Sequence, residues 1–201
     1  MSTDKKIAIL RAWMLGRQYH LALKAFEYAA AQHTGRRKDS VTLEFDHQVS
    51  IALFVKTLVR SLDRPEETLA AVFLHDVPED KNVGYEEIET LFGSQVSRAV
   101  RLLTKRYRGV TSPIYLYYEG MALDNIASIV KGADRMHNIQ TMQEVFDFGK
   151  QDAYIQETEK HVLPMLKASR RKFTTQEPAY ENIKGVLNIQ IELLKAIHKA
   201  G

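Results

Sequence analysis

Apolar residues recur every three to four positions along almost the whole chain, and this spacing restricts it to a helical architecture. Few segments show the strict alternation that is typical of strands. The sequence therefore predicts an all-α protein. The expected helices cover residues 19–33, 47–62, 66–76, 85–92, 94–104, 113–121, 124–141, 153–168 and 179–199.

The composition is that of an ordinary globular protein. The chain has 201 residues, of which 45% are hydrophobic and 26% charged, and it has no segment typical of a linker. We therefore expect a single domain over residues 1–201. No apolar run reaches the roughly 18 residues that span a bilayer, and the N-terminus lacks a signal-peptide core. These absences predict a cytoplasmic protein without a membrane partner.

The chain contains no cysteine, which excludes disulfides, thiolate metal sites and cysteine nucleophiles. A metal must then be held by His, Asp, Glu and water, a donor set that suits manganese, magnesium, iron or zinc. The net charge of +3 weakly favours an anionic ligand. There is no long basic stripe or reading motif for nucleic acid, so we expect a small phosphorylated ligand.

His75 and Asp76 stand at the end of an apolar run, residues 69–74, and Glu79 and Asp80 follow at once. A buried carboxylate must be paired, hydrogen-bonded or bound to a metal. Packing alone does not explain four such side chains within six residues, so we interpret the segment as part of a metal site. Pro78 predicts that the helix ends near Val77, which would leave Glu79 and Asp80 at the mouth of the site.

Further ligands must come from other parts of the chain. His47, at the start of its expected helix, is one candidate, and Asp134 is another because Gly132 and Ala133 beside it allow helices to approach closely. His137 is close enough to Asp134 to face the same way. Each of these residues taken singly also fits a hydrogen-bonded structural role.

This pattern resembles the HD superfamily of metal-dependent phosphohydrolases, and most of all the hydrolase domain of the Rel/SpoT stringent-response enzymes and the small alarmone hydrolases. The segment 74–80, Leu-His-Asp-Val-Pro-Glu-Asp, resembles the family's His-Asp-x-x-Glu-Asp motif. The segment 133–138, Ala-Asp-Arg-Met-His-Asn, resembles its Ala-Asp-Arg-Leu-His-Asn motif. Segments 92–96, 103–105 and 156–158 resemble the family in the same order.

The resemblance implies an HD-domain helical bundle that hydrolyses the 3′-diphosphate of ppGpp or pppGpp, giving GDP or GTP and pyrophosphate. One divalent metal, in this family usually Mn²⁺, would be held by His47, His75, Asp76 and Asp134. Glu79 and Asp80 would be the catalytic residues that orient or deprotonate water. Arg37 and Lys38 resemble the pair that grips the nucleotide. Asn138 and Thr141, one turn apart, are expected to bind the ribose or base.

The segment 43–48 departs from the family, because it lacks the proline and the tyrosine that usually precede the first ligand. Gln140 stands where the family often has arginine. Two alternatives therefore remain open: an HD phosphohydrolase acting on (d)NTPs, nucleoside monophosphates or NADPH, and a catalytically idle nucleotide-binding module. The apolar stripe of residues 183–197 is suited to core packing or to the interface of a homo-oligomer.

Overall fold

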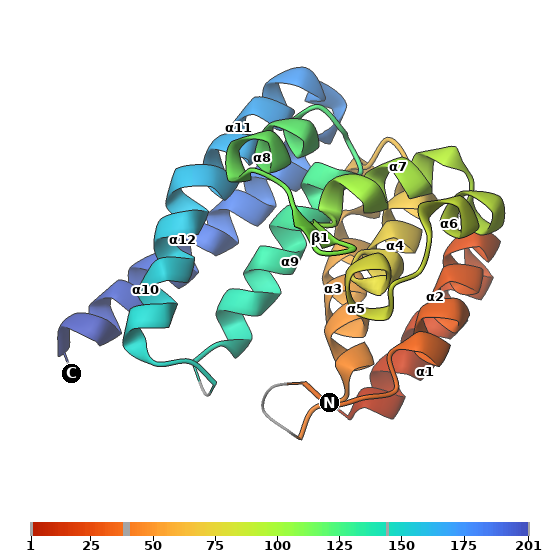
Figure 1. Cartoon of the computed structure of the whole chain (residues 1–201), viewed down its shortest axis with the longest axis horizontal. Helices are drawn as coiled ribbons and strands as arrows, with labels where there is room; N and C mark the ends of the chain where they lie inside the picture. The colour runs from red at the N-terminus through yellow and green to blue at the C-terminus, as the bar shows by residue number, and fades with distance from the viewer. Residues whose placement is uncertain (1, 38–40, 144, 201) are drawn as a thin grey trace.

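The computed structural model describes residues 2–37, 41–143 and 145–200, and it is almost entirely helical (Figure 1). The first half of the chain contains α1 to α7. Their bounds are α1 Thr3–Gly16, α2 His20–Gln32, α3 Glu44–Leu58 with the 3₁₀ turn Val59–Ser61, α4 Pro65–Leu74, α5 Val77–Lys81, α6 Tyr85–Phe92 and α7 Ser94–Leu103.

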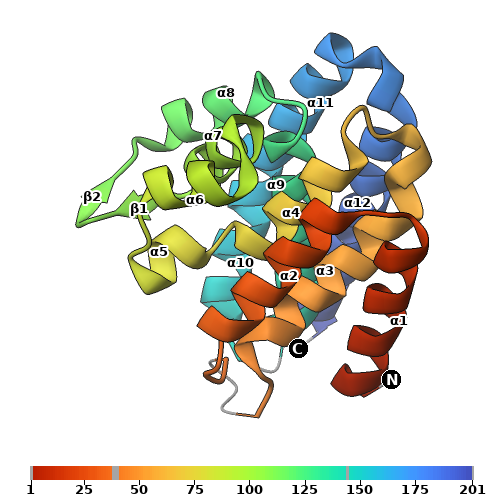
Figure 2. The ribbon, with the colours of Figure 1, turned by 90° about the vertical axis from the view of Figure 1, so that its right-hand side faces the viewer.

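A small antiparallel hairpin, β1 Arg106–Tyr107 and β2 Val110–Thr111, follows α7. It projects from the helical body (Figure 2). The remaining elements are α8 Ile114–Ala122, α9 Ala127–Thr141, α10 Phe148–Glu157, the π-helical turn η2 Thr158–Val162, α11 Leu163–Lys172, the 3₁₀ turn Thr174–Gln176 and α12 Glu177–Ala200. The prediction of an all-α fold is confirmed; within the described ranges the structure adds this hairpin and an isolated β-bridge between Arg36 and Leu43.

Helix α9 lies between the early helices and the C-terminal helices (Figure 1). It contacts α3, α4 and α7 on one side and α11 and α12 on the other. Its N-terminus is capped by Asp124, whose Oδ1 accepts hydrogen bonds from the backbone N–H groups of Ile126 and Ala127 at 2.9 and 2.8 Å. A side chain in the middle of α9 can therefore meet residues from both halves of the fold.

The buried apolar side chains form one cluster. Three of its members are Phe26 of α2, Phe45 of α3 and Phe73 of α4, with Phe26 in edge contact with both of the others at ring centroid distances of 5.0 and 5.3 Å. These contacts fix α3 against α4, the two helices that carry His47 and precede His75. No helix within the described part of the chain is long and apolar enough to cross a bilayer.

Several predicted boundaries were wrong. Helix α4 ends at Leu74 and not at Asp76, and Pro78 stands in the first turn of the next helix, where its missing N–H is tolerated. The chain then turns through His75 and Asp76 into the short helix α5, so Glu79 and Asp80 are helical. Ser112 does not cap α8, which begins one residue later than expected, after Pro113.

Two other helices also differ from expectation. Helix α1 was not predicted, and its few buried residues, Leu10 and Met14, explain the weak sequence signal. The helix expected over 153–168 is split into α10 and α11 by the π-helical turn just before Pro164.

Gly132 of α9 should be intolerant of a side chain. A Cβ at this position would lie 2.8 Å from Cγ2 of Ile183 and 3.0 Å from Cδ2 of Leu166. We expect Gly132→Ala to lower the free energy of unfolding by about 1–3 kcal/mol because α9 must move away from α11 and α12.

Gly185 of α12 is the matched control, because a Cβ there meets nothing within 4 Å. Gly185→Ala should raise the free energy of unfolding by up to about 1 kcal/mol. Urea titrations of both variants measure the difference, and equal effects would contradict the close helix approach at Gly132.

Candidate metal centre

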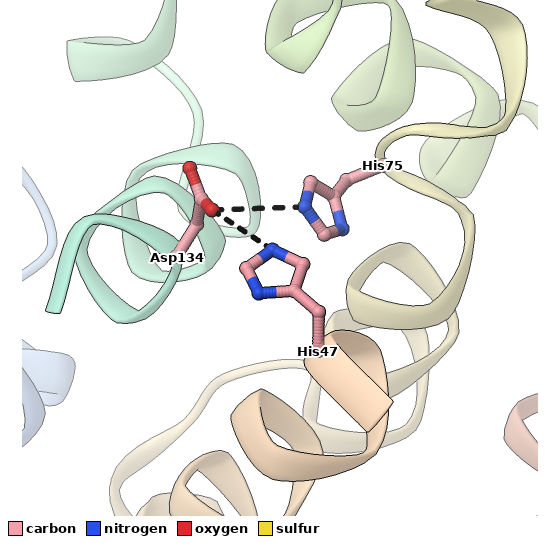
Figure 3. Close-up of side chains that lie close together, drawn as sticks. All are labelled: His47, His75 and Asp134. Atoms are coloured by element: carbon pink, nitrogen blue, oxygen red, sulfur yellow. Dashed lines mark ion pairs between the residues drawn. The ribbon is translucent and has the colours of Figure 1, made fainter. Parts of the chain in front are cut away.

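Three buried side chains from three helical segments converge at one point (Figure 3). They are His47 in the first turn of α3, His75 after the end of α4, and Asp134 in α9. One ligand atom from each lies within 4.8 Å of the other two. Nε2 of His47 is 3.2 Å, and Nε2 of His75 is 3.8 Å, from Oδ1 of Asp134.

Asp76 lies beside this group and is less buried. Its Oδ2 is 3.1 Å from Nε2 of His75, 3.9 Å from Nε2 of His47 and 3.5 Å from Nε2 of Gln48. The chain therefore brings together all four residues that the sequence suggested as ligands.

Both histidines have a hydrogen-bond partner at Nδ1, the ring nitrogen that faces away from the cluster. Nδ1 of His75 is 2.8 Å from the backbone carbonyl of Val72, one turn earlier, and donates to it. Nε2 of His75 is then left buried without a hydrogen-bond partner among the described residues. Because an unpaired buried nitrogen is costly, this lone pair is suited to a metal ion, and the donor set of two imidazoles and two carboxylates fits a divalent cation.

The electrostatics of the group favour added positive charge. Burial lowers the pKa of His75, but the Asp76 and Asp134 carboxylates outweigh burial and raise that pKa to about 9. Burial raises the pKa of Asp76, but His75 opposes it and brings that pKa to about 2. A divalent cation between these side chains would be stabilised by the same two carboxylates that stabilise a proton on His75.

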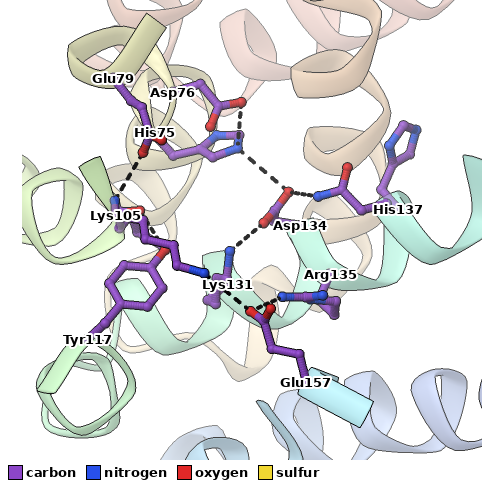
Figure 4. A network of polar contacts seen from close by, with 12 residues as sticks. His75, Asp76, Glu79, Lys105, Tyr117, Lys131, Asp134, Arg135, His137 and Glu157 are labelled. Atoms are coloured by element: carbon purple, nitrogen blue, oxygen red, sulfur yellow. Dashed lines mark hydrogen bonds and ion pairs between the residues drawn. The ribbon is translucent and has the colours of Figure 1, made fainter. Parts of the chain in front are cut away.

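The Asp134 carboxylate is held by residues of its own helix (Figure 4). Nζ of Lys131 donates to Oδ2 at 2.9 Å, and Nδ2 of Asn138 donates to Oδ1 at 2.6 Å. Burial raises the pKa of Asp134, but the Lys131 ammonium and His47 outweigh burial and keep it well below the ordinary value. The Lys131 side chain is only 14% exposed, so its ammonium group is held at Asp134 and not in solvent.

Glu79 and Asp80 both line the site but differ in their contacts. Oε2 of Glu79 accepts hydrogen bonds from the backbone N–H groups of Lys105 and Arg106 at 3.0 and 3.2 Å, which attaches the hairpin to α5. Burial, followed by the charge of Asp76, raises the pKa of Asp80 to about 6. Asp80 can thus exchange a proton near neutral pH.

The residues expected to bind a substrate, Arg37, Lys38, Asn138 and Thr141, do not all lie at the cluster in the same way. Nη2 of Arg37 contacts Oδ1 of Asn138 at 3.4 Å, and Asn138 also bonds Asp134 as described. The hydroxyl of Thr141 donates to the carbonyl of His137 at 3.0 Å. Lys38 lies outside the described residues.

Two cavities meet at the cluster. The larger, about 910 Å³, has a partly apolar lining that includes Leu53, Phe54, Met142 and Phe146. The smaller, about 520 Å³, is lined by Lys105, Lys131 and Arg135 together with His75 and Asp134. His47, Asp76, Asp80, Arg37 and Asn138 line both, so one ligand bound at the cluster can extend into both cavities.

Arg135 is the buried cation of the smaller cavity, and its role could not be seen in the sequence. Its side chain is 5% exposed, and Nη2 donates to Oε1 of Glu157 at 2.7 Å and to the hydroxyl of Tyr118 at 3.2 Å. Nε and Nη1 are buried without a hydrogen-bond partner among the described residues, and the guanidinium lies over the Tyr154 ring at 4.8 Å from its centroid. Together with Lys105 and Lys131, Arg135 gives the smaller cavity a cationic lining that suits an anion.

Comparisons with known proteins agree with the resemblance noted in the sequence. Residues 25–108 match the sequence model of the HD domain. A probable guanosine-3′,5′-bis(diphosphate) 3′-pyrophosphohydrolase of Synechocystis sp. is 34% identical over 130 residues, which are 61% of this chain and 17% of that protein. The guanosine-3′,5′-bis(diphosphate) 3′-pyrophosphohydrolase of Spiroplasma citri is 34% identical over 127 residues, 59% of this chain and 16% of that protein.

The fold also matches a solved structure, described as a metazoan ortholog of SpoT that hydrolyzes ppGpp. The TM-score is 0.62 at 24% identity, and the match covers 81% of this chain and 94% of the other. The predicted HD-domain helical bundle is thereby confirmed as the fold. The matched part of the chain spans less than a fifth of the length of each of the two curated relatives named above.

The Arg135–Glu157 pair should make a pH-dependent contribution to stability. Burial raises the pKa of Glu157, but Arg135 and the hydrogen bond from Tyr118 outweigh burial and lower it from the ordinary 4.5. A lowered carboxyl pKa stabilises the fold above pH 4.5, and this contribution is lost as the pH falls through the folded-state pKa.

We therefore expect Glu157→Gln to lower the free energy of unfolding by about 2–3 kcal/mol at pH 7, and by less below pH 4.5. Glu159→Gln is the control, because the Glu159–Lys195 pair is exposed, and it should cost at most about 0.5 kcal/mol. Denaturant titrations over a pH series measure both effects. A Glu157→Gln effect that is as small as the control, or constant with pH, would contradict the assigned pair.

Proposed function

We propose that this chain, whose residues 25–108 match the HD domain, is a metal-dependent phosphohydrolase that removes the 3′-diphosphate of ppGpp or pppGpp. The observation that carries the proposal is the cluster of His47, His75 and Asp134, with Asp76 beside it, at the junction of the two cavities. The names of the curated relatives support the substrate.

In this proposal His47, His75, Asp76 and Asp134 hold one divalent cation, and we propose Mn²⁺. When bound, such a cation lowers the pKa of water and polarises a phosphoryl oxygen. The protein supplies the orientation of the ligands: Val72 fixes the ring of His75, while Lys131 and Asn138 fix the carboxylate of Asp134.

Glu79 and Asp80 are proposed to act on the water and the leaving oxygen. Asp80 lines both cavities, so its carboxyl group lies where the two parts of a substrate would separate. A group positioned there can take a proton from water or give one to the leaving oxygen. The carboxylate of Glu79 is held in place by backbone N–H groups of the hairpin. It is proposed to orient water while its own position stays fixed.

The two cavities suggest how the substrate is oriented. The larger cavity has the apolar lining that a nucleoside needs, with Arg37 at its junction with the cluster. The smaller cavity is lined by the cationic side chains of Lys105, Lys131 and Arg135, which suit the diphosphate group. Asn138 and Thr141 are proposed to contact the nucleotide from α9, and Lys38 to assist Arg37.

We propose a single domain over residues 1–201, because the buried apolar side chains in the described part of the chain form one cluster. A cytoplasmic location and a homo-oligomeric state stay predictions. The first alternative, a phosphohydrolase of another nucleotide, keeps the same metal centre and differs only in the occupant of the larger cavity.

Product analysis tests the proposed reaction. The purified protein with Mn²⁺ is incubated with ppGpp, GTP, dATP or NADPH, and products are separated by anion-exchange chromatography. We expect GDP and pyrophosphate from ppGpp, with the rate reduced at least about 10²-fold in Asp76→Ala, since that variant lacks one of the proposed ligands.

Turnover of another nucleotide with ppGpp left intact would overturn the substrate and retain the metal centre. Absence of turnover with all four nucleotides would favour an idle binding module. Hydrolysis of ppGpp at the same rate in Asp76→Ala would contradict the ligand assignment.

The smaller cavity can be tested by inhibition with inorganic pyrophosphate. Lys105 is 40% exposed at the edge of this cavity. We expect Lys105→Ala to weaken pyrophosphate inhibition by about tenfold because a cation that contacts the anion is lost.

Lys160 is an exposed lysine of the π-helical turn that lines neither cavity. Lys160→Ala should leave the inhibition constant as it is in the unaltered protein. Equal inhibition constants for the two variants would exclude the smaller cavity as the diphosphate site.

A further inference from the structure

His47 and His137 form a direct contact between their ring nitrogens. The two Nδ1 atoms are 2.8 Å apart, and the residues are only 4% and 9% exposed. The rings are tilted by 58° at a centroid distance of 4.8 Å, so they meet through these atoms and are not stacked. Two nitrogens at this distance share one proton, which one ring donates and the other accepts.

The position of His47 decides which ring donates. Its Nε2 faces Oδ1 of Asp134 at 3.2 Å, on the side where the cluster converges. A metal ligand must offer a lone pair on that nitrogen, so the proton of a neutral His47 lies on Nδ1. Nδ1 of His137 is then the acceptor, and a neutral His137 carries its own proton on Nε2.

His75 reaches the same tautomer by a different route. Its Nδ1 donates to the backbone carbonyl of Val72. A backbone carbonyl accepts only and thus fixes the tautomer by itself. The partner of His47 is another imidazole, which can either donate or accept, so the tautomer of His47 depends on that of His137.

The remaining nitrogen of His137 has a different environment. His137 lines the larger cavity but not the smaller one. No described residue accepts a hydrogen bond from its Nε2. In Figure 4 the ring lies on the opposite side of Asp134 from Lys131, which belongs to the smaller cavity. An Nε2–H group of His137 is thus available to a ligand in the larger cavity.

We propose that His137 is a positioning residue with two functions: Nδ1 holds His47 in its metal-binding tautomer, and Nε2–H donates to an acceptor atom of the ligand in the larger cavity. The inference rests on the proposed metal-dependent function. It links metal affinity to recognition of the nucleotide part of the substrate through one side chain.

Two substitutions separate the two functions. His137→Asn keeps an amide oxygen near the position of Nδ1 and lacks a group at the position of Nε2. His137→Gln places its amide near the position of Nε2 and removes the acceptor at the position of Nδ1. His20→Asn, at an exposed histidine at the start of α2, is the control for loss of a histidine.

Zinc affinity, measured without nucleotide by competition with a chromophoric chelator, tests the first function. We expect His137→Asn and His20→Asn to stay within about threefold of the unaltered protein, and His137→Gln to bind zinc about 10- to 100-fold more weakly. In steady-state kinetics with the substrate that is turned over, His137→Asn should raise KM more than it lowers kcat.

Nitrogen-15 NMR of the unaltered zinc-loaded protein reads the tautomers directly and does not depend on how the variants fold. We expect the protons on Nδ1 of His47 and Nε2 of His137. A proton on Nδ1 of His137, or zinc affinity of His137→Gln equal to that of the unaltered protein, would overturn the proposal. Because neither readout involves a nucleotide, these results are independent of whether ppGpp is the substrate.

Discussion

The burial of the Asp134 carboxylate is the constraint on which the site depends. A carboxylate removed from water is tolerated only when its charge is balanced and its oxygens are hydrogen-bonded. Here α9 provides this balance with Lys131 one turn before and Asn138 one turn after Asp134. Oδ1 also faces the two imidazoles. The close approach of α9 to α11 and α12 at Gly132 holds this helix in the centre of the fold, where it meets α3 and α4.

The break between α4 and α5 is the second element that shapes the site. Helix α4 ends at Leu74, His75 and Asp76 occupy the turn that follows, and Pro78 stands in the first turn of α5. The turn presents both side chains to α9. Helix α5 then carries Glu79 to the smaller cavity and Asp80 to both cavities. Both residues keep right-handed helical dihedrals through this turn. The imidazole and the carboxylate meet through Nε2 of His75 and Oδ2 of Asp76, which are 3.1 Å apart.

Much of this arrangement could be predicted from the sequence. Helical periodicity located most helices, and the adjacent His75 and Asp76 after a buried run indicated the site. Other features depend on contacts between residues far apart in the chain. The pairing of His47 with His137 joins residues 90 positions apart, and the hydrogen bonds from the hairpin to Glu79 join residues 26 and 27 apart. The sequence alone does not show that Lys131 is buried, and only the fold shows that Asp134 is its partner. Helix α1 is likewise attached through a distant contact, Lys6 with Asp46.

Anomalous X-ray diffraction from crystals of the protein grown with Mn²⁺ tests the central claim most directly. The account predicts one strong anomalous peak at the manganese edge, within coordination distance of His47, His75, Asp76 and Asp134, and its loss in crystals of Asp134→Asn. A peak elsewhere in the molecule, or no peak from a protein that hydrolyses its substrate, would contradict the assignment of this cluster as the metal centre.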